Sequence, residues 1–121
     1  MRVPALADAD ELVPRILGLK SQTDGVSVKV VGELNRPPYE KNNAGAVLFE
    51  HAKTLAAEIG FELVGTSTGG GSDGNFTAGH TATLDGLGVD GQGAHTHYEQ
   101  LYISSIEPRA QLLYRLYQTL R

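Results

Sequence analysis

The stretch GGGSDGNFTAGH, residues 69–80, places three consecutive glycines directly before a polar cluster of serine, aspartate, glycine and asparagine. Glycine allows positive φ angles and lets a ligand approach the backbone amides closely. Residues 75–78 fit a helical turn, and the free N–H groups at the start of a helix attract an anion. A glycine-rich turn between a strand and a helix explains the same residues without a ligand. The stretch is not a Walker phosphate loop, because no lysine follows its last glycine.

The chain around this loop has the composition of a soluble globular domain. It has 121 residues, of which 40% are hydrophobic and 20% are charged. A net charge of -4 argues against nucleic acid as a partner, since no basic stripe is available to bind phosphates. The apolar runs are too short to cross a bilayer and the N-terminus lacks a signal-peptide layout, so we expect a cytoplasmic protein with no membrane partner. Because the chain has no cysteine, any metal must be bound by His, Asp and Glu.

The first third of the chain is predicted to form a helix and then a strand. Apolar spacing predicts a helix over residues 8–19, and Pro14 favours Asp10 as its N-cap because proline is tolerated only near the first turn. Alternating valines predict a strand over residues 26–34 with one covered face. The two prolines that follow at 37–38 end this strand, since neither can donate to a ladder of backbone hydrogen bonds.

The rest of the chain continues the alternation with shorter strands. The clearest helix is predicted over residues 43–59, and Gly60 follows it where a left-handed C-cap is wanted. Short strands are predicted over residues 61–65 and 81–84. The alternation of helices and strands indicates an α/β fold.

A last helix is predicted near the C-terminus. Ser104 and Glu107 have the spacing of a capping box ahead of it. Its buried face is expected to carry four leucines, namely Leu112, Leu113, Leu116 and Leu120.

Two histidines lie in the segment GAHTHYE, residues 93–99. On an extended segment His95 and His97 would point to the same side, and histidine is the usual neutral metal ligand. A zinc site needs three or four ligands at ~2.0–2.2 Å, so a polar loop with two solvated imidazoles explains this segment equally well. His51, on the polar side of a helix, and His80, in a turn, are expected to be structural.

Arg36 precedes two prolines in LNRPPY, residues 34–39. The rigid prolines would hold the guanidinium where it can clamp a carboxylate through two parallel hydrogen bonds. A solvated arginine at the end of a strand is the alternative.

Together and in this order, the motifs resemble the C-terminal part of the zinc-dependent exopeptidases and deacylases. The resemblance is carried by NRPP at 35–38, GGGSDGNF at 69–76, LDGLG at 84–88 and GAHT at 93–96 followed by Glu99. That family includes glutamate carboxypeptidases, acetylornithine deacetylases and succinyl-diaminopimelate desuccinylases. The resemblance covers nearly the whole chain and is closest to the glutamate carboxypeptidase branch, which GGGSDGNF followed by TLDGLG and GAHT matches best.

The resemblance implies a two-domain enzyme, with a mixed-sheet catalytic domain and a smaller α+β lid that often dimerises. Residues 1–36 would be the second half of the lid, and residues 37–121 the C-terminal part of the catalytic domain. The glycine loop would lie on the floor of the cleft and hold the carboxylate or the scissile amide of the substrate, with Asn75 as the side-chain donor. The substrate-binding residues would be Arg36, Gly70, Gly71, Ser72, Asp73 and Asn75.

The resemblance also implies two zinc ions in each intact active site, where they would activate a bridging hydroxide. His95 matches the last metal ligand. The His-x-Asp motif and the Glu-Glu pair that supply the other ligands and the general base in the family are missing from this sequence. We therefore expect a C-terminal fragment of a zinc-dependent amidohydrolase that has no activity by itself and does not retain zinc.

The expected partners follow from the same resemblance. An N-acyl amino acid or a peptide would be the substrate of the intact enzyme. Homo-oligomers would form through exposed strand edges, with residues 26–34 as the favoured edge. The alternatives are a fragment of a deacylase of the acetylornithine or succinyl-diaminopimelate type, an anion-binding module that uses the glycine loop, and a purely structural dimerisation module.

Overall fold

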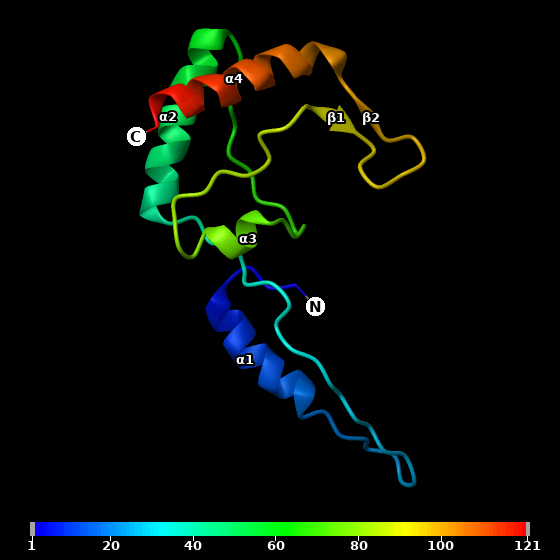
Figure 1. Ribbon diagram of the computed structural model, residues 1–121. Coiled ribbons are helices and arrows are strands. Elements are labelled where there is room, and N and C mark those ends of the chain that lie inside the picture. The colour runs from blue at the N-terminus through cyan, green and yellow to red at the C-terminus, as the bar shows by residue number, and fades with distance from the viewer. Residues whose placement is uncertain (1, 121) are drawn as a thin grey trace.

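The computed structural model describes residues 2–120 (Figure 1). It contains helices α1 (Leu6–Leu17), α2 (Asn43–Ile59), α3 (Gly74–Thr77) and α4 (Ile106–Thr119), with a short 3-10 turn at Ile103–Ser105 before α4. The described residues form one small sheet, in which β1 (Gly91–Gln92) pairs antiparallel with β2 (Gln100–Leu101). None of the helices within residues 2–120 has the length and apolar character needed to span a membrane.

The core lies where α2 packs against α4. The apolar side chains buried there are Ala52, Leu55, Ala56, Leu63, Leu112 and Leu116. Leu112 is 0% exposed. Two polar contacts join the same helices at their edges: an ion pair of Arg115 with Glu58, and a hydrogen bond of 2.7 Å between His51 Nε2 and Thr119 Oγ1. His51 therefore has a structural contact, as expected.

Helix α2 has the bounds that the sequence predicts, because both of its ends are specified by local chemistry. The Asn42 side chain accepts a hydrogen bond from the Gly45 N–H at 2.7 Å, which satisfies one of the free donors of the first turn. The Asn42 amide also donates to the Ala78 carbonyl at 3.1 Å, which ties α2 to the end of α3. Gly60 ends the helix at φ 106°, a conformation that glycine adopts without a Cβ clash.

Helix α1 begins earlier than predicted, and the predicted cap at Asp10 is wrong. The N-cap is Ala5, so Pro14 lies inside the helix. The first turn is supported from a distant part of the chain, because the Glu40 carboxylate accepts a hydrogen bond from the Leu6 N–H at 2.6 Å. An acceptor that lies 34 residues away along the chain leaves no signal in the local sequence.

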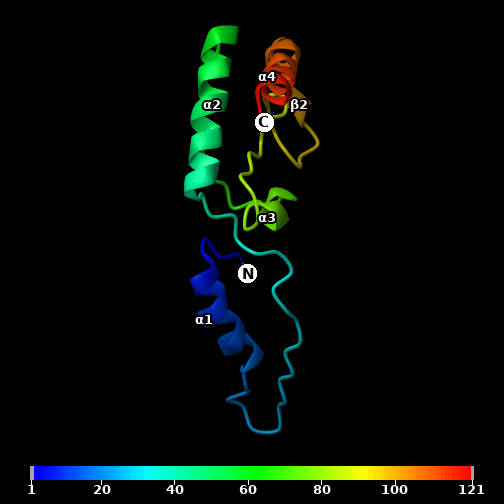
Figure 2. The same cartoon turned by 60° about the vertical axis from the view of Figure 1, so that its left-hand side comes forward.

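The three strands predicted over residues 26–34, 61–65 and 81–84 are not formed, so the mixed sheet is reduced to the pair β1–β2. These segments have no neighbouring strand within the described chain, and a strand exists only through its ladder partners. Residues 26–34 run from the far end of an arm, beside α1, back toward α3 (Figures 1 and 2). The helices with their small sheet remain compatible with a fragment of an α/β fold.

The start of α4 also differs from the prediction. Its N-cap position is Ser105 and makes no side-chain cap hydrogen bond, so the capping box of Ser104 and Glu107 is wrong. Ser105 Oγ instead accepts from the Asp90 N–H at 2.9 Å and donates to the Tyr102 carbonyl at 2.6 Å. This buried hydroxyl ties the base of the β1–β2 hairpin to α4. Among the four predicted core leucines of the helix, Leu112 and Leu116 are buried, Leu113 is half-buried and Leu120 is exposed.

Candidate functional site

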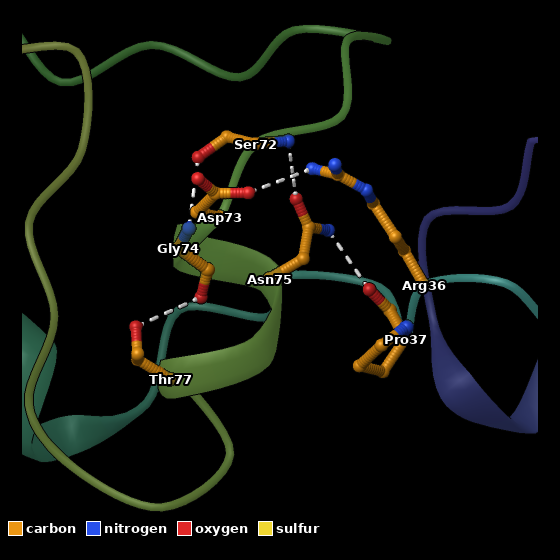
Figure 3. Close-up of polar contacts among 7 residues, drawn as sticks. All are labelled: Arg36, Pro37, Ser72, Asp73, Gly74, Asn75 and Thr77. Carbon is orange, nitrogen blue, oxygen red and sulfur yellow. Dashed lines mark hydrogen bonds and ion pairs between the residues drawn. The ribbon is translucent and has the colours of Figure 1, made fainter.

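The glycine loop and the segment before α2 meet through the side chain of Asn75 (Figure 3). Asn75 Oδ1 accepts a hydrogen bond from the Ser72 N–H, and Asn75 Nδ2 donates to the Pro37 carbonyl, both at 2.8 Å. Asn75 and Pro37 are 38 positions apart in sequence. The amide therefore fixes the position of one segment relative to the other.

Arg36 lies against the same loop. Its Nη1 is 3.5 Å from Asp73 Oδ1, and its guanidinium carbon lies 5.2 Å from the centroid of the Phe76 ring. The Asp73 side chain is 98% exposed and the Arg36 side chain 38% exposed, so water screens this ion pair strongly. The stacked ring covers part of the guanidinium and leaves other N–H donors available to a ligand.

The loop itself is shaped by short polar contacts. Ser72 Oγ accepts from the Gly74 N–H at 2.9 Å, which closes a tight turn before α3. A side chain at Gly71 would come within 3.5 Å of Arg36 Cδ, so the arginine stem crosses the loop at close range. Arg2 adds a hydrogen bond to the Gly69 carbonyl from the N-terminal segment. The sequence-predicted residues Arg36, Gly70, Gly71, Ser72, Asp73 and Asn75 thus belong to one neighbourhood.

Helix α3 is only one turn long, and Asp73 at its N-cap makes no side-chain cap hydrogen bond. The helix start therefore gives little support for the anion site suggested by the sequence, because a macrodipole needs several aligned turns. The positive charge in this neighbourhood comes from Arg36, beside Asp73, and from Arg2, which donates to the Gly69 carbonyl. A carboxylate is the ligand chemistry that a partly exposed guanidinium fits best.

His95 lies in the loop between β1 and β2. It has φ 64°, the one positive φ of a residue other than glycine within residues 2–120, and histidine tolerates this region better than most side chains. The Glu99 carboxylate accepts a hydrogen bond from the His95 N–H at 3.1 Å, and Thr96 Oγ1 donates to the Gly93 carbonyl at 2.6 Å. These contacts hold the loop in one shape and leave the His95 side chain exposed.

The structure does not gather a metal-binding group around His95. Within the described residues, no three His, Asp or Glu side chains are placed to hold a metal ion together. The β1–β2 loop and α3 lie apart in both views of the ribbon (Figures 1 and 2). His97 is exposed in the same loop. One imidazole falls short of the three or four ligands that zinc needs, so the donor set present in residues 2–120 does not fit zinc by itself.

The sequence did not indicate three neighbours of the site. They are the Pro37 carbonyl, which accepts from Asn75, the Phe76 ring, against which Arg36 lies, and Tyr39. The Tyr39 hydroxyl donates to the Thr83 carbonyl. Partial burial raises the pKa of Tyr39 above 10.0, and the negative charge of Asp85 raises that pKa further. Two features of the sequence could have indicated these neighbours: Tyr39 directly follows the two prolines, and Phe76 directly follows Asn75.

The comparisons with known proteins bear on these residues. The profile described as Peptidase family M20/M25/M40 matches residues 5–119, which is nearly the whole chain. No curated protein and no solved structure matches this chain.

Proposed function

The chain belongs to the peptidase family M20/M25/M40, and we propose that it is the C-terminal part of a glutamate carboxypeptidase-like metallopeptidase, which hydrolyses an amide beside a substrate carboxylate. The observation that carries this proposal is the meeting of Arg36 with the glycine loop through Asp73, Asn75 and Phe76. A cation held beside three consecutive glycines is a good receptor for the carboxylate of a small substrate, because the glycines let the ligand lie close to the backbone.

The roles within the proposed site follow from the contacts. Arg36 receives the carboxylate, because its guanidinium is held from one side by Phe76 and at one edge by Asp73 while other donors stay accessible. Gly70 and Gly71 are exposed and let a substrate lie close to the backbone. Ser72 keeps the turn closed through its hydrogen bond with Gly74.

His95 is the proposed contribution of this chain to a zinc site. The positive φ and the hydrogen bond to Glu99 fix the backbone from which its imidazole projects, and such strained positions cluster at functional sites. The other ligands and the general base have to come from residues that this sequence does not contain. Amide hydrolysis therefore requires a further polypeptide segment.

The surface of the chain supports a partial domain. Its accessible area is 9441 Å², whereas a compact monomer of this mass has about 6,300 Å². Val64 is exposed on the extended segment that follows α2, on the opposite side from buried Leu63. In the proposed enzyme, residues 37–121 complete the catalytic domain and residues 1–36 belong to the lid.

The first test is calorimetric titration of the chain with glutarate, a dicarboxylate that mimics the glutamate side of the substrate. We expect binding that Arg36→Ala reduces by about tenfold or more, because a charge-assisted hydrogen bond is worth about 1.5–3 kcal/mol. The matched control is Arg15→Ala, which removes an exposed arginine on α1 that is paired with Glu11. Equal affinities of the wild type and Arg36→Ala would overturn the assignment of the carboxylate site.

The second test concerns activity. The purified chain is expected to leave N-acyl glutamate intact, with or without added zinc, because a single imidazole binds zinc weakly and the chain lacks the carboxylate ligands. Steady hydrolysis that copurifies with the chain and disappears in His95→Ala would show that the chain is an enzyme by itself.

A further inference from the structure

We propose that Asn75 is a positioning residue for Arg36: its side-chain amide clamps the Pro37 carbonyl to the glycine loop and thereby sets where the guanidinium lies. This inference rests on the proposed function for the role of Arg36 as carboxylate receptor. The resemblance implies that the Asn75 side chain donates a hydrogen bond to the substrate. In this inference its hydrogen bonds go to the protein itself.

The clamp needs an amide in one orientation. Asn75 Oδ1 faces the Ser72 N–H, a donor, and Asn75 Nδ2 faces the Pro37 carbonyl, an acceptor. Turning the amide over would place donor against donor and acceptor against acceptor. An aspartate has the same shape but no donor, so it keeps the contact with Ser72 and sets a carboxylate oxygen against the Pro37 carbonyl.

The Pro37 carbonyl is the effective point at which to hold this segment. Pro37 and Pro38 have no N–H, so carbonyl groups are the means by which this stretch can join a backbone network. Proline also fixes its own φ and restricts the residue before it to extended conformations. A fixed Pro37 carbonyl therefore restricts the position of the Arg36 Cα, which is one rigid peptide unit from the Pro37 Cα.

The contacts of the guanidinium itself are too weak to do this alone. The pair of Arg36 with Asp73 is 3.5 Å apart and exposed, and such pairs contribute only about 0–1 kcal/mol. The stacking on Phe76 at 5.2 Å adds about 0.5–1 kcal/mol at an exposed site. Asn75 lies between Asp73 and Phe76 in sequence. The loop that holds the Pro37 carbonyl therefore also carries both contacts of the Arg36 guanidinium.

The experiment uses Asn75→Asp in the 121-residue chain, with Asn43→Asp as the matched control at an exposed position in the first turn of α2. The ligand-free readout is the NMR heteronuclear NOE of the Arg36 Nε–Hε group, which reports how rigidly the guanidinium is held. The ligand readout is the affinity for glutarate. We expect Asn75→Asp to lower the NOE and to weaken glutarate binding by about tenfold, which corresponds to one lost hydrogen bond, while Asn43→Asp changes neither.

Lowering the pH gives a rescue that a merely structural role does not predict. A protonated carboxyl at position 75 regains a donor for the Pro37 carbonyl, so the Arg36 NOE of Asn75→Asp should rise toward that of the wild type as the pH approaches about 4. The wild type measured at the same pH values is the control for every other effect of acid on the chain. In the wild type, the Asn75 side-chain amide should exchange with solvent more slowly than that of Asn43, a measurement that needs no variant.

Each outcome decides between the two proposals. A lower NOE together with weaker glutarate binding supports the positioning role. Weaker binding with an unchanged NOE means that Asn75 contacts the ligand directly, which overturns this inference and leaves the proposed function intact. A lower NOE in a chain whose wild type does not bind glutarate supports the clamp and removes the carboxylate site. An unchanged NOE with unchanged binding, or an Asn75 amide that exchanges as fast as that of Asn43, overturns the clamp.

Discussion

At the scale of single residues, Tyr39 gives a pH-dependent prediction. Its half-buried hydroxyl donates to the Thr83 carbonyl, and burial followed by the charge of Asp85 raises its pKa above 10.0. The folded chain therefore binds this proton more tightly than the unfolded chain. The contribution of the Tyr39 hydroxyl to the free energy of unfolding is fully present below pH 10. It is lost as the pH rises through the raised pKa of Tyr39.

We expect Tyr39 to ionise above pH 10.0 in an NMR titration. Asp85→Asn should lower the pKa of Tyr39, because it removes the nearby negative charge. Asp24→Asn, at an exposed turn, should leave it unchanged. A Tyr39 that titrates at or below pH 10.0 would contradict the burial of its hydroxyl beside Asp85.

The candidate site shows how far sequence can reach at this scale. The motif resemblance selected Arg36, Asp73 and Asn75, and the structure brings these residues together. The acceptor role of Pro37 was not visible, because every residue has a backbone carbonyl and only the fold decides which one meets Asn75. The metal role of His95 stays a prediction, since no three His, Asp or Glu side chains within residues 2–120 are placed to hold a metal ion together.

At the scale of elements, the packing of α2 on α4 carries the core. Leu112→Ala removes a side chain that is 0% exposed between these helices and should lower the free energy of unfolding by about 2–5 kcal/mol. Val47→Ala, on the exposed side of α2, should change it by less than about 0.5 kcal/mol. Chemical denaturation followed by circular dichroism compares the two variants. Similar losses in both would show that α2 and α4 do not form the cooperative core.

Helices were predictable where their ends are local, and strands were not. Asn42 and Gly60 specify both ends of α2 within the sequence itself. Residues 26–34 alternate as a strand should, but pairing depends on a neighbour that the described chain does not provide. The same reason applies to residues 61–65, where Leu63 is buried and Val64 faces solvent.

At the scale of the whole molecule, the large accessible area predicts self-association. Val31 is 78% exposed on the extended segment 26–34, where Val26 and Val28 are also exposed. Unpaired extended segments with apolar side chains tend to pair with another copy. We expect concentration-dependent dimers in analytical ultracentrifugation, and Val31→Lys should weaken them because a charge on an edge opposes pairing. A Val47→Lys control changes an equally exposed valine away from this segment. A strict monomer at high concentration would contradict the prediction.

The unpaired stretches before and after α2 also bear on the fate of the polypeptide in a cell. Extended backbone that lacks ladder partners fits directly into the active site of an endoprotease, so cleavage within residues 26–34 or after Val64 should outpace cleavage inside the helices. The half-life of the polypeptide would then depend on how quickly a complementary segment covers these stretches. Its abundance would be set by assembly rather than by its rate of synthesis.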